Sequence, residues 1–460
     1  MYESFFNPKS VAVIGASRDK SSAGYGVLKS LLKGGVFKST TNQPFTGKIY
    51  PVNPKTKNIQ GQKSYSSIKD IPGKADLGII CVPAKIVPIV LKDSIGKINS
   101  AVIISAGFSE IGNSELEKEI LTIARNANIR IIGPNCLGVM RPSKKLNATF
   151  GPCMAYPGDI AFFSQSGALI DSIIDWSLER EYGFSTIVSM GNKSDIDIPD
   201  LLEWAAQDKE TKAIALYIEG IKNGRKFLRI ASKVSKLKPI VALKAGRFKT
   251  GMKAVSSHTG SLAGSYDVYK AAFKQSGVHI ADNVDDLFEM AETLSIQPPC
   301  KKNNIAIITN GGGAGVLCAD HCENLGINLA KLSQKTLNKL DNSGKMHPAY
   351  SRKNPLDLVG DALSDRYKIA IDAVLSQQNV YGLIVIQTLQ TMTQPVLDAK
   401  AIIAARKKFP EKPIIASYMG GHYTKKAAQL LEDNNIPDFN VPYKAARAMK
   451  ALIDRNNYKT

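Results

Sequence analysis

Short runs of β-branched and aliphatic residues alternate with longer segments of helical period along almost the whole chain. This alternation is typical of consecutive βα units, whose strands pair in parallel and whose helices cover the sheet. It therefore predicts an α/β protein. The predicted strands cover residues 10–14, 48–52, 77–82, 101–105 and 129–132, then 160–163, 186–189, 213–218 and 240–244, and finally 305–309, 383–387 and 414–417.

Two stretches of different composition divide the strands into three groups. A Pro- and Lys-rich stretch at 141–157 follows the first group, and QPPCKKNN at 297–304 indicates a linker before the third. A chain of 460 residues accommodates about three domains. We expect a five-stranded Rossmann-like domain at 1–140 and two further α/β domains at 150–297 and 304–460.

Charge and composition disfavour several classes of protein. The formal net charge of +20 is spread along the chain, which favours anionic small molecules as ligands over nucleic acid. No apolar run approaches the roughly 20 residues of a membrane span, and the first residues lack the features of a secretion signal. The six cysteines include no CxxC pair, which suits a reducing compartment. We expect a cytoplasmic protein without membrane or nucleic-acid contact.

A metal site is not predicted. Cys318 and Cys322 lie at helical spacing with His321 between them, but zinc would need a fourth ligand that the local sequence does not offer.

Two segments repeat the same strand, turn and helix pattern. IAFFSQSGALI at 160–170 and IAIITNGGGAGVL at 305–317 each run from a buried strand through small residues into a helix. In parallel α/β units such a turn leaves backbone N–H groups unpaired at the positive end of a helix, which favours phosphate. Glycine also occurs in tight turns for steric reasons alone, so a single turn of this kind is weak evidence for a phosphate site. Two such turns predict a phosphate held from two sides.

The segment AVSSHTGSLAGS at 254–265 presents one histidine, His258, among residues with little side chain to pack. A neutral imidazole is a competent nucleophile near neutral pH. A surface histidine in a turn is the alternative, and His258 alone does not decide between them.

The first turn, VIGASRDKSSAGYG, lacks the GxGxxG spacing of a dinucleotide site. The second predicted strand leads into Asn53 and Lys55 rather than into the acidic residue that binds the ribose of NAD. An NAD-dependent dehydrogenase is therefore disfavoured. A cation there suits an additional phosphate, such as that of coenzyme A, although these residues alone do not establish coenzyme A. The remaining alternative, a CoA- or nucleotide-sensing DNA-binding regulator, would need a recognition helix, and no convincing one is found.

Six motifs together resemble one known family. SVAVIGAS, YPVNPK, IGPNCLG, FFSQSGAL, YIEG and SSHTGSLAGS, in this order, are similar to the NDP-forming acyl-CoA synthetases, in particular the alpha subunits of ADP-forming acetyl-CoA synthetases, which are related to succinyl-CoA synthetase. The resemblance covers the whole chain. It implies a CoA-binding Rossmann-like domain followed by two flavodoxin-like ligase domains, the first of which carries His258.

The resemblance also implies roles for individual residues. His258 would be the phosphohistidine, and Glu219 the carboxylate that orients its ring. The coenzyme A contacts would come from Gly15, Ala16, Ser17, Asn53, Lys55, Val82, Pro83, Asn135 and Cys136. The phosphate-binding residues would be Ser164, Gln165, Ser166, Gly167, Gly191, Asn192, Gly311, Gly312, Gly313, Ala314 and Gly315.

The implied reaction interconverts acyl-CoA, ADP and phosphate with a carboxylic acid, CoA and ATP, through an acyl phosphate and a phosphohistidine. ADP or ATP with Mg²⁺ would bind an ATP-grasp domain, for which the chain has no room after Ala445. We therefore expect a separate beta subunit or a missing C-terminal domain to supply it, in a dimer of such units. Acetate is the implied acid, but another short acid or a hydroxy acid would need only changes in the pocket.

Overall fold

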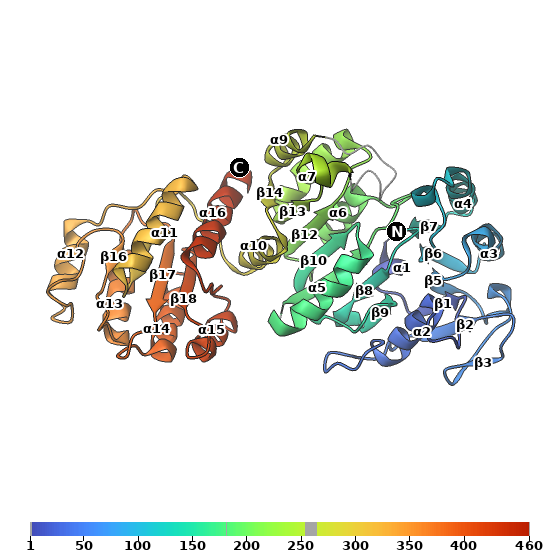
Figure 1. The fold of residues 1–460 in the computed structure, drawn as a ribbon, viewed down its shortest axis with the longest axis horizontal. Coiled ribbons are helices and arrows are strands. Elements are labelled where there is room, and N and C mark those ends of the chain that lie inside the picture. The colour runs from blue at the N-terminus through green and yellow to red at the C-terminus, as the bar shows by residue number, and fades with distance from the viewer. Residues whose placement is uncertain (1, 181, 254–264, 460) are drawn as a thin grey trace. The chain divides into compact units, whose positions relative to one another are not determined.

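The computed structural model describes residues 2–180, 182–253 and 265–459. The chain divides into two compact units, Met1–Leu287 and Phe288–Thr460. The first unit contains two large sheets and the second contains one, so the predicted α/β class is confirmed (Figure 1).

The first sheet is wholly parallel, with the strand order β2-β1-β5-β6-β7. In chain order this is 2-1-3-4-5, which matches a Rossmann sheet without its outermost strand. The predicted five strands are confirmed, with small shifts at their ends. They are β1 (Ser10–Ile14), β2 (Lys48–Val52), β5 (Ala75–Ile80), β6 (Ile98–Ile103) and β7 (Arg130–Ile132).

Helices cover both faces of this sheet. The short α1 (Glu3–Phe6) and α2 (Ala23–Lys33) pack on one face, and α3 (Val87–Asp93) and α4 (Ser114–Asn126) pack on the other (Figure 1). A small hairpin of β3 (Asn58–Ile59) and β4 (Gln62–Lys63) follows β2. Because all five strands are parallel, their carboxyl ends and the turns that follow them meet at one edge.

The second sheet has the order β14-β13-β12-β10-β11-β8-β9. Its five parallel strands again follow the order 2-1-3-4-5, which is that of flavodoxin. They are β10 (Tyr156–Ser164), β11 (Gly183–Ser189), β12 (Ala213–Ile218), β13 (Ile240–Lys244) and β14 (Val278–Ala281). Helices α6 (Ile198–Gln207), α7 (Gly224–Leu237) and α9 (Tyr266–Ser276) pack side by side on one face, and α5 (Gly167–Arg180) covers the other.

The stretch at 141–157, predicted to end the first domain, contains secondary structure that the sequence did not indicate. This stretch contributes to a hairpin of β8 (Gly138–Arg141) and β9 (Leu146–Thr149), in which β8 pairs antiparallel with β11. The two four-residue strands around Pro142–Lys144 are too short to produce a detectable alternation. The partners of β8 in β11, Ile187 and Val188, are also distant along the chain. Strand β14 was not predicted either.

The second unit has one parallel sheet in the order β16-β15-β17-β18, formed by β15 (Ala306–Thr309), β16 (Leu356–Asp357), β17 (Leu383–Thr388) and β18 (Ile414–Met419). The two-residue β16 was not predicted. A parallel bridge between Ala416 and Asp438 occupies the place of a fifth strand, so the order is again flavodoxin-like.

Two layers of helices enclose this sheet. Helices α11 (Gly312–Asn324) and α16 (Pro442–Lys459) pack against each other on one face. The other face carries a row of α12 (Gln334–Asp341), α13 (Ser364–Leu375), α14 (Pro395–Lys408) and α15 (Lys425–Glu432) (Figure 1). Helix α10 (Val284–Ile296) contains the division between the two units. Within the described residues, no helix has the length and apolar character of a membrane span.

One continuous apolar core joins the two sheets of the first unit. It runs from Val11 and Leu28 in the first sheet and its helix to Phe163 and Phe227 in the second layer. At the junction, the ring of Phe6 in α1 lies 3.9 Å from the ring of Trp204 in α6, between centroids. Because the core is shared, the first sheet cannot move independently of the second.

We predict that Phe6→Ala lowers the free energy of unfolding of the first unit by about 3–5 kcal/mol, because it leaves a cavity in the shared core. Chemical denaturation followed by tryptophan fluorescence measures the loss. The control is Phe37→Ala, since Phe37 is 68% exposed and its truncation leaves no cavity. Equal stabilities of the two variants would contradict the shared core.

Candidate active site

A cavity of about 620 Å³ lies at the carboxyl edge of the first sheet, where that edge meets the beginning of α5. The first sheet contributes Val82, Pro83, Ser105, Asn135 and Cys136 to its wall, and the second contributes Gln165, Ser166, Gly167, Ala168 and Asp171. Four of the predicted coenzyme A residues and three of the predicted phosphate residues therefore line the same cavity.

The remaining predicted coenzyme A residues lie at the ends of β1 and β2, on the same sheet edge but outside the cavity wall. Asn53 Nδ2 donates to the carbonyl of Ala16 over 2.7 Å, and Asn53 Oδ1 accepts from the backbone of Lys55 over 2.8 Å. Gly15 has a φ of +92°, and a β carbon there would lie 2.7 Å from the carbonyl oxygen of Cys81. The turn is thus narrow and specific for glycine. The exposed Lys55 adds a cation beside it.

The turns after β5, β6 and β7 support one another inside the cavity. Ser105 Oγ donates to the carbonyl of Val82, and the carbonyl of Ser105 accepts from the backbone of Asn135 over 3.0 Å. Cys136 Sγ donates to the carbonyl of Ile103 over 3.3 Å. Burial raises the pKa of Cys81 to about 12 and the pKa of Cys136 further. These thiols are therefore neutral at physiological pH and do not act as nucleophiles.

The predicted phosphate turn of the first unit follows β10. Ser164 Oγ accepts from the backbone of Ser166 over 3.0 Å and donates to the carbonyl of Ser166 over 2.8 Å. Helix α5 begins immediately afterwards at Gly167, so the N–H groups of its first turn have no partner within the helix. The turn is therefore held rigidly with its donors at the cavity.

The second unit repeats this arrangement, as the sequence predicts. Thr309 Oγ1 accepts from the backbone of Gly311 over 3.0 Å and donates to the carbonyl of Gly311 over 3.0 Å. Helix α11 begins at Gly312 and includes Gly313, Ala314 and Gly315. A β carbon at Gly311 would lie 2.7 Å from Thr388 Oγ1, and one at Gly312 would lie 2.8 Å from Asp357 Oδ2. Glycine is thus needed for the close approach of neighbouring strand ends.

Glu219 follows β12 and is buried, with 5% of its surface exposed. Gln165 Oε1 accepts from the backbone of Glu219 over 2.8 Å and from that of Gly220 over 3.1 Å, so the wall of the cavity also fixes Glu219. The predicted nucleophile His258 lies outside the described residues.

Two buried lysines that were not predicted interact electrostatically with Glu219. Burial lowers the pKa of both Lys193 and Lys244. The charges of Asp197 and Glu219 oppose the shift of Lys193, and the charge of Glu219 opposes that of Lys244. Lys193 Nζ donates to the carbonyl of Gly220 over 2.5 Å, and Lys244 Nζ lies 4.6 Å from the centre of the Tyr269 ring. Lys244 ends an apolar strand, IVALK, and nothing in that pattern distinguishes it from a solvated lysine.

Gly191 and Asn192, predicted to bind phosphate, lie where the loop after β11 contacts the first domain. A β carbon at Gly191 would lie 2.1 Å from the carbonyl oxygen of Pro134. Asn192 Nδ2 donates to Glu110 Oε2 over 2.6 Å and to Glu117 Oε2 over 3.0 Å. Burial disfavours the charge of both carboxylates, but their hydrogen bonds outweigh it and lower the pKa of each. The Asn192 amide donors are therefore already in use.

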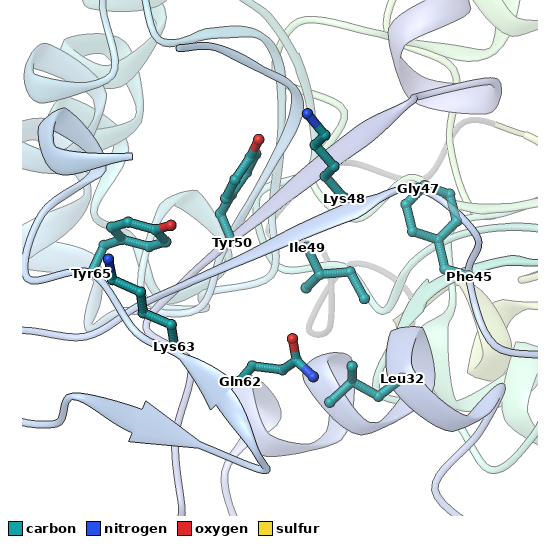
Figure 2. A pocket seen from close by; sticks show the side chains of 9 residues that line it. All are labelled: Leu32, Phe45, Gly47, Lys48, Ile49, Tyr50, Gln62, Lys63 and Tyr65. Carbon is teal, nitrogen blue, oxygen red and sulfur yellow. The ribbon is translucent and has the colours of Figure 1, made fainter. Parts of the chain in front are cut away.

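A second cavity, of about 470 Å³, lies beside β2 and contains none of the predicted site residues. Figure 2 shows Ile49, Gln62 and Leu32 gathered on one side of the strand, with Lys48 and Tyr50 extending from it on another. Within the residues that the structure describes, no group of three or more His, Cys, Asp or Glu side chains is arranged to hold a metal ion.

Three family models match the chain in succession. They are a CoA binding domain at residues 9–142, a succinyl-CoA ligase like flavodoxin domain at 157–294 and a Ligase-CoA domain at 305–458. The alpha subunit of ADP-forming acetate–CoA ligase II of Pyrococcus furiosus is 44% identical, over 99% of this chain and 98% of that subunit. The chain belongs to the ADP-forming acyl-CoA ligase family.

Two further relatives are informative. One is longer than this chain, and the other has a solved structure. The ADP-forming acetate–CoA ligase of Methanocaldococcus jannaschii is 45% identical over 97% of this chain, which spans only 62% of that enzyme. The solved structure of dinucleotide-forming acetyl-coenzyme A synthetase 1 from Ca. Korarchaeum cryptofilum, in complex with phosphate and ADP, superposes with a TM-score of 0.92. It is 38% identical and covers 100% of this chain and 97% of its own. The predicted family and fold class are confirmed.

We predict that Asn192→Asp destabilises the first unit by about 2–4 kcal/mol at pH 7–8, because it places a third carboxylate against Glu110 and Glu117. The loss should shrink as the pH falls below about 5, since protonation removes the repulsion. Thermal unfolding across pH 4–8 measures both effects. Asn223→Asp is the control, because the exposed Asn223 caps α7 and aspartate caps equally well. A pH-independent effect would contradict this assignment.

Proposed function

We propose that this chain is the acyl-transferring part of an ADP-forming acyl-CoA ligase, which interconverts acyl-CoA, ADP and phosphate with a carboxylic acid, CoA and ATP. The observation that carries the proposal is the single cavity that joins the carboxyl edge of the CoA-binding domain to the start of α5. Acetate is the default acid, by similarity to the named relatives.

In the proposed first step, coenzyme A lies along the carboxyl edge of the first sheet, from Gly15, Ala16 and Ser17 through Asn53 and Lys55 to Val82, Pro83, Asn135 and Cys136. Lys55 would neutralise a phosphate of the ligand. The thioester then meets the turn Ser164 to Gly167. A phosphate oxygen attacks the carbonyl carbon, the carbon–sulfur bond breaks, and CoA leaves as the thiolate. The N–H groups of α5 stabilise the charge on the phosphate and on the carbonyl oxygen.

In the second step, His258 attacks the phosphorus atom of the acyl phosphate. The bond between phosphorus and the acyl oxygen breaks, and the carboxylate is released. Glu219 accepts a hydrogen bond from one ring nitrogen, which leaves the other as the nucleophile. The buried Lys193 and Lys244 would offset the charge that a phosphoryl group brings to this side of the sheet.

The histidine phosphate then passes to ADP on an ATP-grasp domain, where Mg²⁺ would neutralise the phosphates. The alpha-subunit name of one relative and the greater length of another support a separate beta subunit or a fused domain as the source. We propose the phosphate-binding turn of Gly311 to Gly315 as the contribution of the second unit, and a cytoplasmic dimer of such units as the assembly.

The test measures two partial reactions. In His258→Ala, formation of ATP from acetyl-CoA, ADP and phosphate with an ATP-grasp partner should fall at least about a thousandfold, because the phosphoryl carrier is lost. Phosphate-dependent cleavage of acetyl-CoA should persist, since His258 acts only afterwards. Glu219→Gln should lower ATP formation about a hundredfold.

His422→Ala and Glu203→Gln are the matched controls, because both side chains are exposed. Both should retain full activity. The wild-type chain should carry an acid-labile, base-stable phosphate that His258→Ala lacks. ATP formation by His258→Ala, or by the lone chain without an ATP-grasp domain, would refute the proposal.

A further inference from the structure

The turn after β12 carries Glu219 and is held from two sides. On one side, Gln165 in the cavity wall accepts from the backbone of Glu219. On the other side, the backbone N–H of Ile221 donates to Tyr269 Oη over 3.2 Å. Tyr269 lies near the start of α9 and is half-buried. It therefore fixes the backbone two residues after Glu219, although the proposed mechanism gives it no function.

Lys244 connects Tyr269 to the same turn. It ends β13 and pairs in register with Ile218, the residue before Glu219. Only 1% of its surface is exposed. Its ammonium group donates to the carbonyl of Ala245 and lies 4.6 Å from the centre of the Tyr269 ring. Within the described residues it forms no ion pair. The ring face offsets part of the cost of burying this cation, and a negative charge nearby is needed for the rest.

Glu219 supplies that negative charge. Burial lowers the pKa of Lys244, and the charge of Glu219 opposes this shift. Lys193 also interacts with Glu219, but it has a second carboxylate, Asp197, whose Oδ1 lies 3.7 Å from Lys193 Nζ. Burial and then the charge of Glu219 raise the pKa of Tyr217 in β12, so this neighbour is neutral. Among the described residues, Glu219 is therefore the carboxylate that balances the charge of Lys244.

We propose that Lys244 and Tyr269 are positioning residues for Glu219. Tyr269 fixes the turn that presents the carboxylate, and the ammonium group of Lys244 keeps that buried carboxylate ionised. Both act through Glu219 and not on the reacting atoms. The inference rests on the proposed function, in which the ionised Glu219 accepts a hydrogen bond from the ring of His258.

The two contacts of Tyr269 can be separated by substitution. Its ring faces Lys244, whereas its hydroxyl accepts from Ile221. Tyr269→Phe keeps the ring and loses only the acceptor, and Tyr269→Leu loses both. Lys244→Met keeps an unbranched side chain of similar length and removes only the charge.

The first experiment measures ATP formation from acetyl-CoA, ADP and phosphate by the complete enzyme, including its ATP-grasp part, between pH 5 and 9. In Lys244→Met the acid limb of the kcat profile should move up by about one pH unit, because the carboxylate takes up a proton more easily without the cation. Tyr269→Phe should lower kcat about tenfold with the acid limb in place, because only the turn loses a partner. Tyr269→Leu should show both effects, with a smaller shift of the limb than Lys244→Met. The KM for acetyl-CoA should not change in any of the three.

Lys270→Met is the matched control, since Lys270 is exposed and follows Tyr269 in the sequence. It removes one positive charge from the same helix end and should leave both the rate and the acid limb unchanged. An acid limb that stays in place in both Lys244→Met and Tyr269→Leu would overturn the inference. So would an equal shift in Lys270→Met, because the effect would then come from net charge alone.

The second experiment follows the charge of Glu219 without catalysis. Carbon-13 NMR of the full chain, labelled at the glutamate carboxyl groups, detects the titration of each carboxylate, and Glu219→Gln identifies the signal of Glu219. This signal should titrate about one pH unit higher in Lys244→Met than in the wild type, and less than that in Tyr269→Leu.

The two readouts separate this inference from the proposed function. A shifted Glu219 signal in an enzyme that forms no ATP supports the interaction with Lys244 and refutes the proposed function alone. An unshifted signal in an enzyme that forms ATP refutes the inference and leaves the proposed function intact. If Lys244→Met does not fold, Tyr269→Leu decides by the same criteria, because it removes the ring that stabilises the ammonium group.

Discussion

The shared apolar core of the first unit is the interaction on which the site depends. The rings of Phe6 and Trp204 pack together at the junction of the two sheets, and the hairpin of β8 and β9 extends the second sheet next to the first domain. Gly191 permits the close approach of the turn after β7 to the loop after β11. Because the core holds both sheets as one body, the carboxyl edge of the first remains opposite the start of α5. A cavity of about 620 Å³ is the result.

Charge is distributed unevenly around this cavity. Its wall contains backbone donors, neutral thiols and one carboxylate, while the buried Lys193 and Lys244 lie on the Glu219 side. In such an environment each polar group interacts more strongly than it would in water. The separation suits a reaction in which an uncharged thioester is cleaved in one place and a phosphoryl group is taken up in another.

Much of the architecture could be predicted because parallel βα units produce long, regular patterns. The first two strands, Ser10–Ile14 and Lys48–Val52, agree to the residue with the prediction. The repeated turns after β10 and β15 also contain the same hydrogen bond. A hydroxyl at the end of the strand, Ser164 in one turn and Thr309 in the other, accepts from the backbone N–H two residues later. The β8 and β9 hairpin, β14 and β16 escaped prediction, because strands of two to four residues carry little periodicity and are defined mainly by a distant partner. The equally short β7 and β15 were predicted because each is an apolar run that leads into a turn containing glycine.

The sequence by itself determined the class of fold, the turns that can hold phosphate and the family, because backbone geometry and helix ends are local properties. Only the tertiary structure decided which of these residues meet. It placed Val82 and Asn135 on the same cavity wall as Gln165, and it engaged Asn192 with two glutamates. It also brought two buried lysines within electrostatic range of Glu219. It also placed Asp171 on the wall of the cavity. Burial and pairing depend on residues far apart in the chain, so no local pattern could reveal them.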